Sequence, residues 1–345
     1  MRGGDEVHIL SSKWELDIDD KIVKHKFCRL SYNNILHNYK IFKKIVKENK
    51  IDIVYIQHRI VGIYPKIYNF FKERVPCVYV LHTEKLENNS LISSLCTYKG
   101  KLNIAISTRV KEYLIRELKI PQEKIRLIYN GVDERNLKPL DSAERNERRA
   151  KLGIDKDKLV ICLHGRIDYV KGHDLLITAI GRLSESQRNR IHVLISGEIK
   201  NNPYYDQLQK SINELQIEDK VSFIGWCSSQ DILGISDLMV QPSRREGFPL
   251  SVVEAFFMKV PVIRSLTGGA EDMQKCCRFV AVNDIEQLTN EIARFINAYD
   301  TSEINEYEEM SDRAYVFAKD NCTVSTMTKR IREVFLEILN ENKKS

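Results

Sequence analysis

The chain has 345 residues, of which 43% are hydrophobic and 30% are charged. This length exceeds what one hydrophobic core usually supports, so we expect two domains, and the balance excludes a largely disordered, collagen-like or disulfide-stapled chain. No apolar run approaches the roughly 20 residues that a membrane-spanning helix needs, and none follows the start as in a signal peptide.

The distribution of charge and the spacing of the cysteines further limit the partners and the compartment that we expect for this protein. Residues 1–150 hold 29 Lys and Arg against 19 Asp and Glu, whereas residues 151–345 hold 25 against 29. A basic half can attract nucleic acid, anionic lipid or a phosphorylated substrate, or it can simply be a solvated surface. The basic residues lack the interleaved aromatic residues of single-strand nucleic-acid sites, so we expect no nucleic-acid partner. The eight cysteines lack C-x-x-C spacing, which indicates reduced thiols in a cytoplasmic protein without a metal site.

Short apolar segments alternate with amphipathic segments along the chain. The apolar segments are rich in Val and Ile and do not alternate with polar residues, which is typical of strands buried on both faces of a parallel sheet. The expected strands are, in chain order, 7–12, 51–57, 78–81, 102–107, 125–129, 159–164, 191–196, 221–225, 238–241, 260–263 and 279–282. The expected helices are 33–49, 108–119, 141–151, 174–183, 204–215 and 250–259, then two long helices between 305 and 342. This alternation predicts βαβ units and an α/β fold with doubly wound parallel sheets.

A domain boundary can be placed after the fifth of these strands. Asn130-Gly131-Val132-Asp133 is a turn signal, and a highly charged segment separates it from the next strand. We place the linker near 133–145. The expected units are a first domain at 1–140, a second domain at 141–325, and a C-terminal helix at 326–345 that could pack back on the first domain.

The densest group of candidate site residues lies between 242 and 257. An expected strand ends in a polar loop with Glu246 and Gly247, and an expected helix with Glu254 starts near Pro249. In doubly wound sheets, ligands bind beyond the carboxyl ends of strands, and the free N–H groups of a helix start favour an anion. Two carboxylates beside an anion site would suit a hydroxyl-rich ligand, although an ordinary acidic helix start has the same pattern.

A second group, Gly165 to Gly172, directly follows the expected strand 159–164. Glycine allows close approach to a ligand, and the cations of Arg166 and Lys171 could clamp phosphate oxygens. Taken alone, this group is no more specific than any basic βα loop.

Together the two groups resemble glycosyltransferase family 4 (glycosyltransferases group 1), over about residues 155–275. The resemblance rests on G-R-I-D-x-x-K-G-x-D-x-L-I from Gly165, and on P-S-x-x-E-G-F-P-L-x-x-x-E-A from Pro242. Its most specific element is the E-x7-E pair of Glu246 and Glu254. The family implies retaining enzymes with the GT-B fold, in which two Rossmann-like domains face each other across a cleft.

The resemblance also assigns roles to matching positions. Arg166 and Lys171 match the pair that neutralises the donor diphosphate. Glu246 matches the glutamate that contacts the transferred sugar, and Glu254 matches the one that hydrogen-bonds the donor ribose. The donor site implied in this way comprises Gly165, Gly197, Gly225, Trp226, Gly247, Phe248, Pro249, Leu250 and Glu254. The donor would be a UDP- or GDP-sugar, with no cofactor and no metal.

The basic half matches the acceptor side of such an enzyme. His82 ends an expected strand where the family often places a histidine that faces the reacting sugar, although a lone histidine there is usually structural. His58, Arg59 and Arg109 are weaker acceptor-side candidates. The acceptor would be a saccharide or a lipid-linked saccharide. The apolar stripe of the lysine-rich helix 38–50 is expected to pack on the sheet, with docking on a membrane surface as the alternative.

The start of the chain departs from the family's pattern. Relatives begin with a strand, a glycine-rich loop and a helix, whereas residues 7–10 already resemble their second strand. We therefore expect the first domain to lack its first strand and helix.

The sequence thus predicts a metal-independent hexosyltransferase that is cytoplasmic or peripheral on the inner face of the membrane. Its role would lie in bacterial surface polysaccharide or glycolipid synthesis. Two alternatives stay open. One is a catalytically impaired donor-binding protein or partner subunit, and the other is a GT-B epimerase or phosphorylase.

Overall fold

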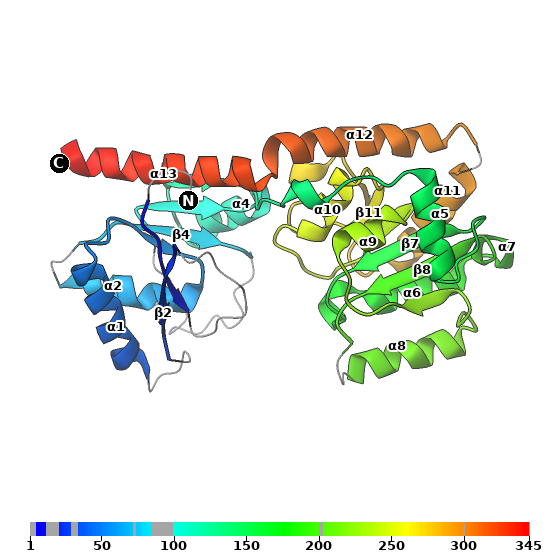
Figure 1. Ribbon diagram of the computed structural model, residues 1–345, viewed down its shortest axis with the longest axis horizontal. Helices are drawn as coiled ribbons and strands as arrows, with labels where there is room; N and C mark the ends of the chain where they lie inside the picture. The colour runs from blue at the N-terminus through cyan, green and yellow to red at the C-terminus, as the bar shows by residue number, and fades with distance from the viewer. Residues whose placement is uncertain are drawn as a thin grey trace.

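The computed structural model describes residues 5–11, 21–28, 34–71, 74–83, 99–199, 203–299 and 301–344. The described chain forms two lobes, each built on a parallel β-sheet with helices packed against it (Figure 1). Every strand pair in these sheets is parallel. The predicted α/β fold with Rossmann-like domains is therefore confirmed.

The second lobe contains a six-stranded sheet. Its order is β12 (Arg278–Val280), β11 (Val262–Ser265), β10 (Leu238–Gln241), β7 (Leu159–His164), β8 (Ile191–Ser196) and β9 (Val221–Phe223). The chain thus proceeds outward from β7 in one direction, then returns and proceeds from β10 in the other. The crevice at the carboxyl ends of β7 and β10 is a topological switch point, which is where open α/β sheets bind ligands.

Helices cover this sheet because their apolar faces match its buried strands. Val160 to Leu163 of β7 are all at most 1% exposed, as expected for a strand covered on both faces. The helices of this lobe are α5 (Ser142–Lys151), α6 (His173–Arg182), α7 (Glu185–Arg188), α8 (Pro203–Glu214), α9 (Ser229–Gly234), α10 (Leu250–Phe257), α11 (Ile285–Ala298) and α12 (Ile304–Asn321). Of these, α7, α9 and α11 were not predicted.

The first lobe contains a four-stranded sheet in the order β3 (Val54–Ile56), β4 (Cys77–Leu81), β5 (Leu102–Ala105) and β6 (Ile125–Leu127). Its helices include α1 (Ile35–Glu48), α2 (Ile63–Phe70) and α4 (Thr108–Arg116). Phe42, Ile45 and Val46 of α1 are buried, so the expected packing of its apolar stripe is confirmed.

Two further strands of the first lobe form a separate sheet. β1 (His8–Ser11) pairs with β2 (Val23–Lys26). β2 was not predicted, because Val-Lys-His-Lys carries almost no apolar signal. Within the described ranges, no strand joins β1 to the sheet of β3 to β6.

The chain passes between the lobes twice, at adjacent points. The Val132 N–H donates to the Cys322 carbonyl at 2.8 Å, and the Val324 N–H donates to the Val132 carbonyl at 3.1 Å. Beyond this point α13 (Val324–Lys344) lies along the first lobe, as α12 lies along the second (Figure 1). An ion pair from Arg126 to Glu337 and an edge-on contact of Tyr55 with Phe335 attach α13 to the first sheet.

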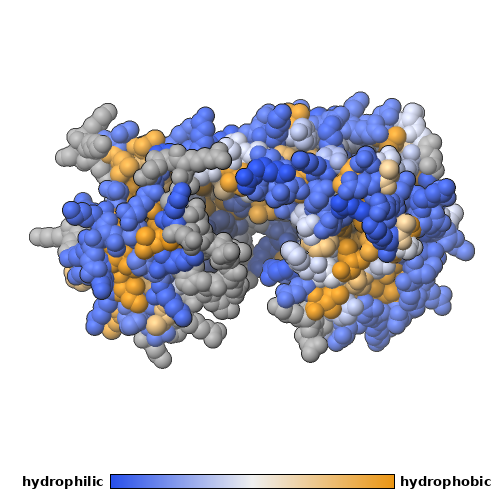
Figure 2. Space-filling model, viewed as in Figure 1, coloured by the Kyte–Doolittle hydropathy of each residue, from blue (hydrophilic) through white to orange (hydrophobic). Residues whose placement is uncertain are grey.

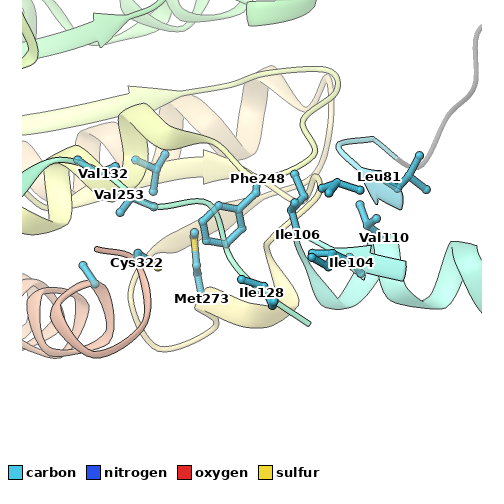
Figure 3. Close-up of a cluster of buried hydrophobic side chains, with 14 of the residues drawn as sticks. Leu81, Ile104, Ile106, Val110, Ile128, Val132, Phe248, Val253, Met273 and Cys322 are labelled. Carbon is cyan, nitrogen blue, oxygen red and sulfur yellow. The ribbon is translucent and has the colours of Figure 1, made fainter. Parts of the chain in front are cut away.

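The lobes share an apolar cluster at this junction (Figure 3). Phe248 of the second lobe stacks on Tyr129 of the first, with ring centroids 5.1 Å apart. Met273 and Cys322 pack in the same cluster as Ile106 and Ile128. Burial on both sides of the junction stabilises the contact, since apolar area is removed from water in each lobe.

Polar contacts reinforce this cluster through one carboxylate, that of Asp272. It accepts hydrogen bonds from the Thr108 N–H at 3.0 Å, the Thr108 hydroxyl at 2.5 Å and the Tyr129 hydroxyl at 2.9 Å. Thr108 opens α4, so the negative charge also meets the positive end of that helix. Burial, together with the adjacent Asp272, raises the pKa of Tyr129, which keeps its hydroxyl protonated as a donor.

No helix in the described parts of the chain combines the length and the apolar character that crossing a membrane requires.

Asp272→Asn should weaken the junction, because an amide cannot accept all three hydrogen bonds and carries no charge. Loss of charge-assisted bonds of this kind costs about 2 kcal/mol, so the thermal unfolding midpoint should fall by several degrees. The control is Glu271→Gln at the exposed neighbouring position. Equal midpoints for the two variants would show that Asp272 does not hold the lobes together.

Candidate functional site

The candidate site lies at the switch point of the second sheet, where two loops follow β7 and β10. The loop after β7 contains a short 3-10 turn (Tyr169–Lys171), whose Asp168 caps the Lys171 N–H. Gly172 follows with φ +74°, and a Cβ there would overlap the carbonyl oxygen of Pro242 in the other loop. The two loops that the sequence singled out therefore touch, and only glycine permits this approach.

The central contact of the site joins Lys171 to Glu246. Lys171 Nζ lies 2.8 Å from Glu246 Oε1, and the two side chains are only 17% and 12% exposed. Gln241 Nε2 donates to the same carboxylate oxygen at 3.2 Å. A partly buried ion pair with an additional donor is held in one geometry, so the cation and the carboxylate are positioned before any ligand arrives.

Arg166, the other expected phosphate-binding cation, is placed differently. Its side chain is 80% exposed and pairs with Asp168 at 3.3 Å. The structure thus separates the two predicted cations into one enclosed charge, on Lys171, and one charge at the solvent rim, on Arg166.

A second arginine, which the sequence analysis did not single out, braces these loops. Arg244 Nη2 lies 2.6 Å from Asp174 Oδ2, and its guanidinium stacks 3.7 Å above the centre of the Tyr169 ring. Although burial disfavours the charged carboxylate, hydrogen bonds from Arg244 and Tyr204 hold the pKa of Asp174 below its ordinary value. The adjacent arginines of Pro-Ser-Arg-Arg-Glu were visible in the sequence, but not which one would turn inward.

Glu254 lies on α10 at the other side of the crevice. Its Oε2 accepts a 2.7 Å hydrogen bond from the Ser229 hydroxyl at the start of α9. Burial raises the pKa of Glu254, and the bond from Ser229 offsets part of that effect. Ser229 in turn lies 3.2 Å from His164 Nε2, at the end of β7. Neither Ser229 nor His164 was predicted.

Some residues of the expected donor-site rim are neighbours in the structure. The Gly197 N–H donates to the Gly225 carbonyl at 3.0 Å, and Gly165 lies beside Gly197. Trp226 is 76% exposed. Pro249 precedes α10 as its N-cap and Leu250 is its first residue, as predicted. Phe248 is 5% exposed, because its ring fills the junction between the lobes.

A fully buried arginine supports the loop that holds Glu246. Arg264 at the end of β11 donates to the Gly268 carbonyl at 2.8 Å and to the Thr267 hydroxyl at 3.1 Å. Gly268 packs against the carbonyl of Glu246. A lone arginine in an apolar strand gave no sign of this role.

The first lobe contributes His82, which follows β4. A Cβ on Gly247 would overlap the carbonyl oxygen of His82, so the backbone of this histidine lies directly against the loop of Glu246. Burial lowers the pKa of His82 below its ordinary value, which favours the neutral ring. Figure 2 shows the hollow that separates the lobes on one face.

The weaker acceptor-side candidates are Arg109, His58 and Arg59. Arg109 Nη1 donates to the Leu266 carbonyl at 3.3 Å and so bridges the lobes. His58 is exposed just after β3. The side chain of Arg59 lies outside what the structure describes. Among the described ranges, no three His, Cys, Asp or Glu side chains gather as a metal ion would need.

Comparison with known proteins agrees with this geometry. The family model described as glycosyl transferases group 1 matches residues 144–316, and that described as Glycosyltransferase Family 4 matches residues 1–136. A mannosylfructose-phosphate synthase of Agrobacterium fabrum is 29% identical over 193 residues, covering 54% of this chain and 41% of that protein. An Escherichia coli UDP-Gal:alpha-D-GlcNAc-diphosphoundecaprenol alpha-1,3-galactosyltransferase is 27% identical over 269 residues, covering 73% and 68%.

Solved structures show the same fold. A glycosyltransferase from Rickettsia africae superposes with a TM-score of 0.84 at 23% identity, over 96% of this chain and 90% of that one. Anabaena Alr3699/HepE in complex with UDP superposes with a TM-score of 0.79 at 22% identity, over 92% and 87%.

The chain spans less than half the length of several curated relatives that it matches. The two family models nevertheless account for most of the sequence between them, and the first alone covers half of it. With its fold and with the pair of Glu246 and Glu254 in place, the chain belongs to the family 4, or group 1, glycosyltransferases.

Proposed function

We propose that this protein is a retaining glycosyltransferase that moves a sugar from a nucleotide-diphospho-sugar to an acceptor hydroxyl. One observation carries the proposal. The enclosed pair of Lys171 and Glu246 lies at the switch point of the second sheet, and Gly247, next to Glu246 in the chain, lies against the backbone of His82 from the first lobe. A cation for the leaving group and a carboxylate for sugar hydroxyls thus meet where the two lobes touch.

The proposed reaction requires a cation and a carboxylate of this kind. A nucleoside diphosphate leaves with developing negative charge, and a fixed cation in an enclosed site stabilises it without reorganisation. Lys171 has this role, while Arg166 assists from the rim, and no metal is required. Glu246 accepts hydrogen bonds from the transferred sugar, and Glu254 accepts one from the donor ribose. The neutral His82 ring faces the reacting sugar.

The donor and acceptor sides are divided between the lobes. Residues 1–140 would bind the acceptor and residues 141–325 the donor, while the helix at 326–345 returns to the first domain. The similarity to proteins that are named for, or solved with, UDP and UDP-sugars supports UDP as the first donor nucleotide to test, with GDP as the second. Closure of the cleft would exclude water and so limit donor hydrolysis.

The acceptor is proposed to be a saccharide on a lipid carrier, in bacterial surface polysaccharide or glycolipid synthesis. The similarity to a galactosyltransferase named for a diphosphoundecaprenol-linked acceptor supports this class. A protein that works on such an acceptor would be cytoplasmic and peripheral on the inner face of the membrane.

The first lobe has a surface that suits this location. Lys40, Lys43 and Lys44 of α1 are exposed, and the buried stripe of the same helix leaves them facing outward. Phe70 and Phe71, at the end of α2, are 81% and 65% exposed. Apolar residues interrupt the hydrophilic surface of this lobe in Figure 2. Exposed cations and exposed aromatic rings on one lobe are features that favour binding to an anionic lipid surface.

Lys171→Ala should lower kcat/KM for sugar transfer or donor hydrolysis by about 10²–10³, as loss of one preorganised electrostatic group does. Arg166→Ala should cost clearly less, because solvent screens its exposed charge. Steady-state rates with UDP- and GDP-sugars measure both, and Lys210→Ala on α8 is the control for an exposed lysine. If Lys171→Ala matches the control, Lys171 does not stabilise the leaving group.

Donor affinity should depend on pH through Glu254. The ionised carboxylate accepts the ribose hydroxyl, so affinity is full at high pH and falls as the pH drops through the raised pKa. That decline should therefore begin above the pH expected from the ordinary value of 4.5. Titration calorimetry with a nucleotide-sugar measures it. Glu254→Gln should bind the donor weakly at every pH. The control, Glu271→Gln, should retain the wild-type dependence of affinity on pH. A wild-type dependence in Glu254→Gln would show that Glu254 does not bind the donor.

Binding to vesicles should depend on α1. Each lysine near an anionic surface contributes about 1 kcal/mol, so replacing Lys40, Lys43 and Lys44 together by Glu should lower the partition coefficient at least about 100-fold. Co-sedimentation with phosphatidylglycerol vesicles measures this at low salt. The same replacement at Lys156, Lys210 and Lys329 of the second lobe and α13 is the control. Equal losses in both triple variants would argue against a dedicated surface.

Turnover separates the enzyme from the alternative functions. Donor binding without hydrolysis or transfer, with candidate saccharide acceptors present, would favour a donor-binding partner subunit. Product formation without an acceptor alcohol, or only with phosphate, would favour an epimerase or a phosphorylase.

A further inference from the structure

A chain of three side chains from three separate elements ends on Glu254. His164 is the last residue of β7, Ser229 the first of α9, and Glu254 lies within α10. The Ser229 hydroxyl is 2.7 Å from Glu254 Oε2 and 3.2 Å from His164 Nε2. The roles proposed for Lys171, Arg166, Glu246 and Glu254 do not explain why His164 and Ser229 lie there.

The direction of these hydrogen bonds follows from counting protons. Serine has one hydroxyl hydrogen, which it donates to the carboxylate. The second contact is satisfied only when His164 donates from Nε2, because the oxygen of Ser229 can then accept. Burial, and then the charge of Lys171, lowers the pKa of His164, so the ring is neutral with its hydrogen on Nε2. Its Nδ1 is buried without a hydrogen-bond partner among the described residues.

This arrangement has a consequence for Glu254. A half-buried glutamate on an eight-residue helix has rotamer freedom to lose when it binds a ligand. Ser229 engages Oε2 and thereby fixes the plane of the carboxylate, which leaves Oε1 for a ligand hydroxyl. His164 keeps the serine hydroxyl pointed toward the carboxylate, because the serine oxygen accepts from the ring.

We propose that Ser229 and His164 are positioning residues that orient Glu254 toward the ribose hydroxyls of the donor, and so favour ribonucleotide over deoxyribonucleotide donors. The inference rests on the proposed function, in which Glu254 binds the ribose. It goes beyond that function by naming the residues that make this contact selective. Both residues act through Glu254, and neither needs to touch the donor.

The experiment compares nucleotides with and without the hydroxyls. Binding of UDP and GDP, and of their 2′,3′-dideoxy forms, is measured by titration calorimetry for the wild type, Ser229→Ala, Ser229→Thr, His164→Leu and Glu254→Gln. Ser229→Ala should weaken ribonucleotide binding at least about tenfold, a typical effect of one lost hydrogen bond to a charged group. The dideoxy nucleotide should bind Ser229→Ala and the wild type equally. Ser229→Thr, which keeps the hydroxyl, should restore the affinity.

The double variant Ser229→Ala with Glu254→Gln adds a second test. If Ser229 acts through Glu254, the double variant should bind no more weakly than Glu254→Gln alone. His192 and Ser222 form a matched control, since this pair lies 2.9 Å apart on β8 and β9 of the same domain, away from Glu254. His192→Leu and Ser222→Ala should leave the ratio of ribonucleotide to dideoxy affinity unchanged.

The outcomes distinguish the positioning role of Ser229 from the donor-site role of Glu254. Equal losses for ribonucleotide and dideoxy nucleotide in Ser229→Ala would overturn the positioning role, because a merely structural serine affects both alike. Wild-type affinity in Glu254→Gln would overturn the donor-site assignment itself. Failure of the wild type to bind either UDP or GDP would overturn the proposed function and this inference with it.

Discussion

The candidate site depends on the close approach of the two lobes at Gly247. Its backbone lies against the carbonyl of His82, in a space that no larger residue could share. The same loop carries Glu246 on one side and the junction residue Phe248 on the other. Three consecutive residues of this loop therefore have three different roles. Glu246 places a carboxylate in the site, Gly247 contacts the first lobe, and Phe248 packs in the apolar cluster that holds the lobes together.

The cations of the site differ in whether a protein group already neutralises or binds them. Lys171 is enclosed and has a carboxylate partner, so its cation is held in place without being left uncompensated. Arg244 and Arg264 stabilise the loops around it. Arg244 pairs with Asp174, and Arg264 donates to the Gly268 carbonyl. Arg166, in contrast, is largely exposed to solvent. An anionic ligand would thus meet one exposed cation at the rim and one enclosed cation inside.

Much of the fold could be predicted, because its signals are local. The run from Leu159 to His164 is apolar enough to be a buried strand in any context, and Pro249 marks the start of α10 through its own geometry. The group of Gly165 to Gly172 and the pair of Glu246 and Glu254 stood out because they lie close together in the sequence. β2 could not be found in this way, since its exposed Val-Lys-His-Lys segment is defined by its partner β1 rather than by its own residues.

The residues that support the site could not be predicted, because their contacts join positions far apart in the sequence. Ser229 reaches Glu254 across 25 positions and His164 across 65, and neither residue type is unusual at the end of a strand or the start of a helix. The inward turn of Arg244 depends on Tyr169 and Asp174, which belong to different elements. Such contacts are properties of the assembled sheet, so a sequence reveals the groups that touch a ligand more readily than those that hold them.

The double passage of the chain between the lobes has a mechanical consequence. Val132 and the segment from Cys322 to Val324 are joined by two hydrogen bonds, which form one isolated parallel bridge. Any movement of one lobe against the other would therefore have its pivot at this bridge, because both connections between the lobes cross there together.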